Sequence, residues 1–143
     1  MHLISPYLIT ILIAWIVAQG AKYLIIAIRH RSFDHLRQLY LSGNMPSAHS
    51  ATVVSLMTLV AFRDGVGSGL FAVCALFAAI VMYDAVMVRR SSGEQGVAIQ
   101  YLIKEQRSKA PMPRAAKGHK PLEVVVGGLL GVLIGWVVFL ATY

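Results

Sequence analysis

Apolar residues fall into four long blocks that are separated by polar and mostly basic stretches. The blocks cover residues 3–28, 46–62, 68–88 and 122–141. A helix needs about 20 apolar residues to cross a bilayer, with a range of about 17–25, so each block is long enough for one span. The pattern predicts an all-α integral membrane bundle of four transmembrane helices, with residues 1–143 forming a single domain.

Composition supports a membrane protein. The chain has 143 residues, of which 57% are hydrophobic and 13% charged, and its mean hydropathy is +0.68. These values lie far outside the usual range for a soluble domain of this size. The first apolar block lacks the basic start of a signal peptide and is long, so we interpret it as a retained span.

Two further segments have patterns of their own. Residues 94–106 predict a short interfacial helix in the third loop, because their apolar residues fall on one side. These residues are Ala98, Ile99, Leu102 and Ile103. In the fourth block, Gly127, Gly131 and Gly135 form a stripe of small residues that favours close helix contact and would also permit a second copy of the chain to pack as a homodimer.

Basic residues are unevenly distributed among the loops. Residues 29–45 contain three Lys or Arg residues, residues 89–121 contain eight, and residues 63–67 contain one. By the positive-inside rule, the first and third loops are cytoplasmic and both termini lie outside. Phosphate binding is an alternative explanation for the same basic residues.

Polar residues in and directly beside the apolar blocks gather on that predicted cytoplasmic face. They are Lys22 near the end of the first block, Ser47 and His49 at the start of the second, Asp84, Arg89 and Arg90 at the end of the third, and His119 and Glu123 at the start of the fourth. Each has a simpler explanation alone: Lys22 as a snorkelling side chain, the arginines as interfacial anchors, His49 as a neighbour of a helix cap. Ionisable groups at membrane depth usually mark a site, and their shared side favours one here.

The spacing of two of these residues indicates acid–base or nucleophilic chemistry. His119 and Glu123 are four residues apart near a helix start, which places both side chains on one face. A carboxylate there accepts the Nδ1 proton, fixes the tautomer and leaves Nε2 as a nucleophile or base. His49, from another helix, is placed to protonate a leaving oxygen.

The surrounding charges predict a phosphate-bearing substrate. Lys22, Arg29, Arg89 and Arg90 supply positive charge, and the backbone N–H groups around Ser47 and Ala48 begin a helix, where anions bind well. Metal binding is the rival use of histidine and glutamate, but a third strong ligand is missing from this face, so we predict no metal or other cofactor. We also expect no nucleic-acid partner.

These residues and their spacing resemble the motifs of a known family. The type 2 phosphatidic acid phosphatases carry the motifs KxxxxxxRP, PSGH and SRxxxxxHxxxD. Lys22 and Arg29 fit the first with His30 in place of proline, residues 46–49 fit the second with Ala48 for glycine, and His119 with Glu123 fits the third with glutamate for aspartate. Nearly the full length resembles the divergent bacterial and plant branch of that superfamily, through MPSAHS (45–50), YDAVMVRRSSGEQ (83–95) and GHKPLEVVVGGLLG (118–131).

The resemblance implies a metal-independent phosphatase in the bacterial plasma membrane that acts on a lipid phosphate or polyprenyl phosphate or diphosphate. It implies that His119, oriented by Glu123, forms a phosphohistidine and that His49 is the acid. Lys22, Arg29, Ser47, Ala48, Arg89 and Arg90 would hold the phosphate. Asp84 and Gln95 belong to the branch signature: Asp84 orients an arginine or forms a structural ion pair, and Gln95 contacts substrate or closes the loop.

The Ser-Arg half of the third motif is absent, because position 113 is proline and Arg114 lies one residue too close to His119. Two alternatives therefore stay open beside the phosphatase. One is a non-catalytic lipid-phosphate binder, and the other is a small transporter-like membrane protein. A haloperoxidase ranks behind both, because those relatives are soluble.

Overall fold

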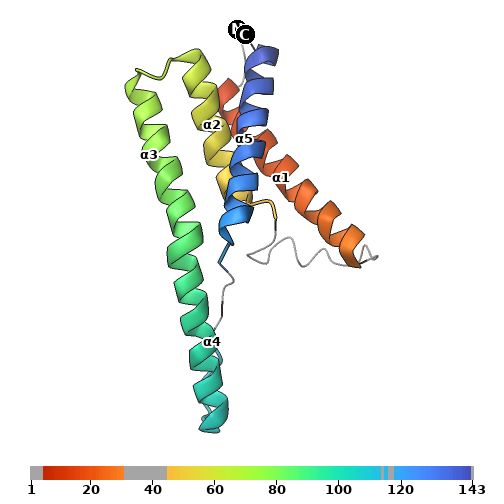
Figure 1. The fold of residues 1–143 in the computed structure, drawn as a ribbon, viewed down its shortest axis with the longest axis vertical. Helices are drawn as coiled ribbons and strands as arrows, with labels where there is room; N and C mark the ends of the chain where they lie inside the picture. The colour runs from red at the N-terminus through yellow and green to blue at the C-terminus, as the bar shows by residue number, and fades with distance from the viewer. Residues whose placement is uncertain (1–4, 31–44, 114, 116–117, 143) are drawn as a thin grey trace.

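The chain forms a bundle of helices in which one helix is far longer than the others (Figure 1). The computed structural model describes residues 5–30, 45–113, 115 and 118–142. In order, the elements are α1 (Pro6–His30), α2 (Ala48–Arg63), α3 (Gly69–Tyr83), the π-helical turn η2 (Asp84–Val88), α4 (Arg89–Glu105) and α5 (Pro121–Thr142). Every regular element in these ranges is helical, which confirms the all-α prediction for this part of the chain.

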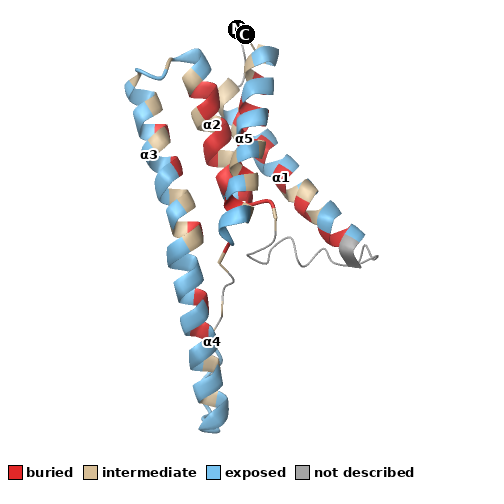
Figure 2. Cartoon of the chain, viewed as in Figure 1, coloured by how far each residue is buried: buried red, intermediate tan, exposed pale blue. Residues whose placement is uncertain are grey.

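Three helices are long and apolar enough to cross a membrane. They cover Pro6–Ile28, Gly69–Glu105 and Pro121–Thr142. The fourth, α2, has 16 residues and is shorter than these. It is also the most completely buried helix, because α1, α3 and α5 all pack against it (Figure 2). The structure therefore has three helices that meet the requirements for a span, together with a shorter apolar helix enclosed by them.

The long helix consists of α3, η2 and α4, which follow one another without a break over 37 residues. At about 1.5 Å per residue it extends over about 55 Å, well beyond the hydrocarbon thickness of about 30 Å. The expected interfacial segment, 94–106, is helical through Glu105, but it continues the axis of α3 and projects past the other helices (Figure 1). No proline interrupts α4, and its two glycines, Gly93 and Gly96, each cost only about 1 kcal/mol, so the backbone continues although the apolar pattern ends.

Local signals set where the helices begin. Ser47 caps α2, accepting a hydrogen bond from the Ser50 N–H at 3.4 Å. Ser68 caps α3 in the same way through the Phe71 N–H at 3.1 Å. Pro121 opens α5, at the position where its missing N–H costs nothing. Between α2 and α3, Gly65 has φ +84°, a conformation that favours glycine.

The glycine stripe of α5 packs directly on α2. A methyl group added to Gly127, Gly131 or Gly135 would come within 2.5–2.6 Å of a carbonyl oxygen of α2. The three carbonyls belong to Ser47, Ala51 and Ser55, one turn apart from each other. The close helix contact predicted from the stripe is confirmed. Because α2 fills the stripe within the chain, the stripe offers no surface to a second copy.

We expect Gly131→Ala to lower the free energy of unfolding by about 1–3 kcal/mol, the usual cost of overpacking. The added carbon would lie 2.6 Å from the Ala51 carbonyl oxygen and 3.0 Å from the Ser55 nitrogen, and backbone atoms cannot move aside easily. Gly128→Ala is the matched control on the same helix, since its nearest neighbour is a Val54 methyl at 3.9 Å. Thermal unfolding in detergent, followed by circular dichroism, measures both. Equal midpoints for the two variants would contradict this packing.

The bundle has two distinct ends. The start of α1 and the end of α5 lie at one end (Figure 1), where Tyr7 donates a hydrogen bond to Asp64 at 2.6 Å and Arg63 donates to the Thr142 hydroxyl at 3.3 Å. At the other end α1 finishes, α2 begins, α3 passes into α4, and α5 begins (Figure 1). The predicted site residues are carried by these segments at that second end.

Candidate active site

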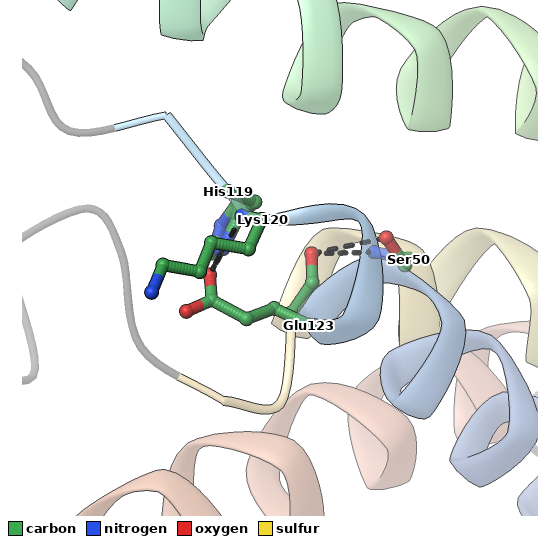
Figure 3. A network of polar contacts seen from close by, with 5 residues as sticks. Ser50, His119, Lys120 and Glu123 are labelled. Atoms are coloured by element: carbon green, nitrogen blue, oxygen red, sulfur yellow. Dashed lines mark hydrogen bonds and ion pairs between the residues drawn. The ribbon is translucent and has the colours of Figure 1, made fainter.

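A histidine–carboxylate dyad lies where α5 begins. His119 Nδ1 is 2.9 Å from Glu123 Oε2, and both side chains are largely buried, at 8% and 15% exposure. His119 immediately precedes Lys120 and Pro121 at the helix start, so the four-residue spacing places the imidazole over the first turn (Figure 3). In a neutral imidazole, a carboxylate at this distance favours the tautomer with the proton on Nδ1, in which Nε2 carries the free lone pair. The geometry suits a nucleophile or general base.

Glu123 is fixed by more than the histidine. The same Oε2 atom accepts a hydrogen bond from the Lys120 N–H at 3.2 Å, and the Glu123 main-chain oxygen accepts one from the Ser47 N–H at 3.1 Å. The first bond also satisfies an otherwise unpaired donor at the helix start. The second joins the dyad to the start of α2. The carboxylate is therefore held at the start of α5, while the Glu123 main chain is held by the residue that caps α2.

Lys22 supplies a buried positive charge from α1. The residue is only 5% exposed, and it lies near enough to Glu123 for charge–charge interaction. Within the described ranges, no hydrogen bond or ion pair joins its ammonium group to another residue. A buried lysine without a partner is costly, which is why such residues usually serve a ligand.

His49 lies on the open side of this group. It is the second residue of α2 and is exposed. Its ionisable neighbours include Lys22, His119, Asp84 and Arg89. The structure therefore brings His49 from α2, Lys22 from α1 and the dyad from α5 to one place, as predicted for three separate helix ends.

The two arginines at the start of α4, Arg89 and Arg90, are each paired with a carboxylate. Arg89 donates to Asp84 at 2.6 Å, and Arg90 donates to Glu94 at 3.1 Å. Their side chains are 50% and 60% exposed. Because such exposed pairs are weak, a phosphate has little to overcome in recruiting either guanidinium. The Asp84–Arg89 contact fits both roles expected of Asp84, orientation of an arginine and a structural ion pair.

The start of α2 is capped by the Ser47 side chain. Ser47 is fully buried, and its hydroxyl accepts hydrogen bonds from the Ser50 N–H and, at 3.0 Å, from the Ser50 hydroxyl. Ala48 is 5% exposed. The Ser47 hydroxyl thus caps the helix, and what this segment offers a ligand is the positive end of the α2 dipole. Ser50, which the sequence analysis did not single out, completes the cap (Figure 3).

One predicted residue, Gln95, does not join the group, and the side-chain position of another, Arg29, is not described. Gln95 donates to the Ser91 hydroxyl at 3.3 Å and lines an open groove of about 430 Å³ on the side of η2 and α4, to which the dyad does not contribute. The Arg29 side chain lies outside the described residues.

Main-chain contacts that sequence reasoning missed hold His119 from the other side. The His119 N–H donates to the Ala85 carbonyl in η2 at 3.1 Å, and Gly118 lies against the Arg90 backbone. Gly118 belongs to the GHKPLE signature, but a glycine does not indicate which residue will pack against it. The Ala85 acceptor is a main-chain carbonyl, which every residue type has, so the sequence could not indicate it. Among the described residues, no three His, Cys, Asp or Glu side chains are grouped as metal ligands would be.

These features define an all-helical integral membrane protein with a buried histidine–carboxylate dyad at one end of its bundle. The sequence profile of a family described as "Divergent PAP2 family" matches residues 3–134. The chain therefore belongs to this divergent branch of the type 2 phosphatidic acid phosphatase (PAP2) superfamily. It is also 39% identical, over 94% of both chains, to a Bacillus subtilis (strain 168) protein described as "Uncharacterized membrane protein YuiD". No solved structure matches the chain significantly.

Proposed function

We propose that the protein is a membrane phosphatase that removes phosphate from a lipid phosphate or a polyprenyl phosphate or diphosphate without a metal ion. The observation that carries this proposal is the buried His119–Glu123 dyad, at 2.9 Å, beside a buried Lys22 that lacks a partner among the described residues. A nucleophilic imidazole next to a cation that makes no hydrogen bond to a described residue suits an anionic electrophile. Membership of the PAP2 superfamily agrees with a phosphate ester as that electrophile.

In the proposed reaction, His119 Nε2 attacks phosphorus and the P–O bond to the lipid breaks. His49 gives its proton to the departing oxygen, so the lipid leaves as an alcohol or, from a diphosphate, as a monophosphate. Water then attacks the phosphohistidine and gives up a proton to His49, which releases inorganic phosphate and restores both histidines. Positioning and charge stabilisation account for most of phosphoryl transfer, so Lys22, the arginines and the start of α2 have the main catalytic task.

The location of the site favours a lipid substrate. The dyad lies at the ends of helices that are apolar enough to cross a bilayer, and the ends of such helices are expected near the lipid head groups. By the positive-inside rule, the flanking basic residues favour the cytoplasmic face for this end, which in a bacterium would be the inner face of the plasma membrane. The lipid tail then remains in the bilayer while the phosphate enters among Lys22, His49 and His119.

A second function, binding of a lipid phosphate without turnover, is favoured by one observation. Arg89 and Arg90 are exposed and paired with carboxylates, and the chain lacks the Ser-Arg pair of the third motif. If neither arginine takes its place, the site keeps its affinity for phosphate but lacks part of the charge that stabilises the transition state.

Release of inorganic phosphate by the detergent-purified protein tests the two functions. The panel is phosphatidic acid, phosphatidylglycerophosphate, and polyprenyl phosphate and diphosphate, each with and without vanadate. We expect release from at least one of these lipids and inhibition by vanadate. No release, with saturable binding of vanadate, would support the binder. Neither release nor vanadate binding would contradict both functions.

A further inference from the structure

The π-helical turn η2 lies between the apolar helix α3 and the polar helix α4, level with the dyad. In an α-helix, each N–H bonds to the carbonyl four residues before it, so the Arg89 N–H would bond to Ala85. Here the Arg89 N–H bonds instead to Asp84, five residues before it. The Ala85 carbonyl is thereby released from the usual ladder. It accepts the His119 N–H at 3.1 Å.

The neighbouring residue makes the contact close. A methyl group on Gly118 would lie 2.4 Å from the Arg90 Cα and 2.5 Å from the Arg90 nitrogen. The chain entering α5 is therefore pressed backbone to backbone against the first turn of α4. Ala85 is only 4% exposed, so water does not readily replace the His119 N–H as its partner. Gly118 and His119 are thus held at two successive points along the long helix.

We propose that η2 is a positioning device for the dyad: its extra residue presents the Ala85 carbonyl to the His119 N–H and so sets the imidazole against Glu123. Ala85 and Gly118 are positioning residues in this arrangement, and neither needs to touch the substrate. π-Turns within α-helices are frequently found at functional sites. A shift of about 1 Å in a reacting group is enough to lower a rate about 10²-fold. A single main-chain hydrogen bond that fixes the position of His119 can therefore have a large effect on the rate. This inference rests on the proposed phosphatase function.

Deletion of Met87 tests the device. With that residue removed, Arg90 follows Ala85 by four positions, so its N–H takes the Ala85 carbonyl in an ordinary α-turn. Met87 is 53% exposed, and its side chain contributes little packing within the chain. Met87→Ala is the matched control, because it removes the same side chain and keeps the residue count of the π-turn.

Two measurements on the full chain in detergent separate positioning from a general structural role. The first is hydrogen–deuterium exchange of the His119 amide, which we expect to be at least about tenfold faster in the deletion variant than in Met87→Ala. The second is phosphate release, for which we expect kcat to fall about 10²-fold and KM to change by much less. A folded deletion variant with unchanged His119 exchange and unchanged kcat would overturn the proposal.

Gly118→Ala decides the question if the deletion variant does not fold. The added carbon would collide with the Arg90 backbone and move His119 from Ala85, so we expect the same two changes. Gly67→Ala is its control, since nothing lies within 4 Å of that position. Wild-type exchange and kcat in Gly118→Ala would overturn the proposal. If the wild-type protein releases no phosphate from any lipid, the phosphatase function fails, while exchange of the His119 amide still tests the contact.

Discussion

Replacement of His119 by glutamine is expected to abolish phosphate release, with a fall in kcat of at least about 10⁴-fold, as is typical when a covalent nucleophile is removed. Glutamine keeps a polar side chain of similar length beside Glu123, so the loss would be chemical rather than structural. The measurement is release of inorganic phosphate from the best wild-type substrate. Vanadate binding and the thermal midpoint of the same variant report whether the site and the fold remain intact.

Glu123→Gln separates the two members of the dyad. An amide in place of the carboxylate no longer holds the Nδ1 proton, so the wrong tautomer is favoured, and we expect kcat to fall by about 10²–10⁴-fold. The main-chain bond from Ser47 to Glu123 does not depend on the side chain and should persist. If His119→Gln retained more than a tenth of wild-type release, the phosphohistidine mechanism would be excluded.

The dyad and the helices were predictable because they depend on local patterns. A four-residue spacing brings two side chains to one face of any α-helix, so His119 and Glu123 could be paired before their distance was known. The apolar blocks predicted helical segments for the same reason. The glycine spacing of α5 likewise predicted a close helix contact. The sequence did not indicate that α2 would be the partner helix.

The long helix and its π-turn could not be predicted in this way. The apolar pattern ends at Val88, and hydrophobic periodicity alone suggests a new element there, although the backbone runs on to Glu105. The acceptor for the His119 N–H is the main-chain oxygen of Ala85. Every residue type has such an oxygen, so the sequence does not indicate this contact. The burial of the Ser47 hydroxyl was also hidden, since a serine at a helix start is equally suited to capping and to binding a ligand.

Lys22→Met is expected to weaken phosphate binding without lowering the stability of the fold. Methionine fills a similar volume, and it removes a buried charge that has no partner in the described part of the chain. We therefore expect the free energy of unfolding to stay the same or rise. Vanadate affinity should fall about 10–100-fold, because a hydrogen bond to a charged group contributes about 1.5–3 kcal/mol. Phosphate release should fall at least as much.

Lys104→Met is the control, because Lys104 is exposed near the end of α4, and neither quantity should change appreciably. If Lys22 only stabilised the bundle or reached to the interface, Lys22→Met would lower stability and leave vanadate affinity unchanged. The signs of the two effects therefore distinguish a lysine kept for packing from one kept for a phosphate. A gain in stability together with a loss of affinity would mean that the fold maintains an unfavourable buried charge at the site for the sake of its ligand.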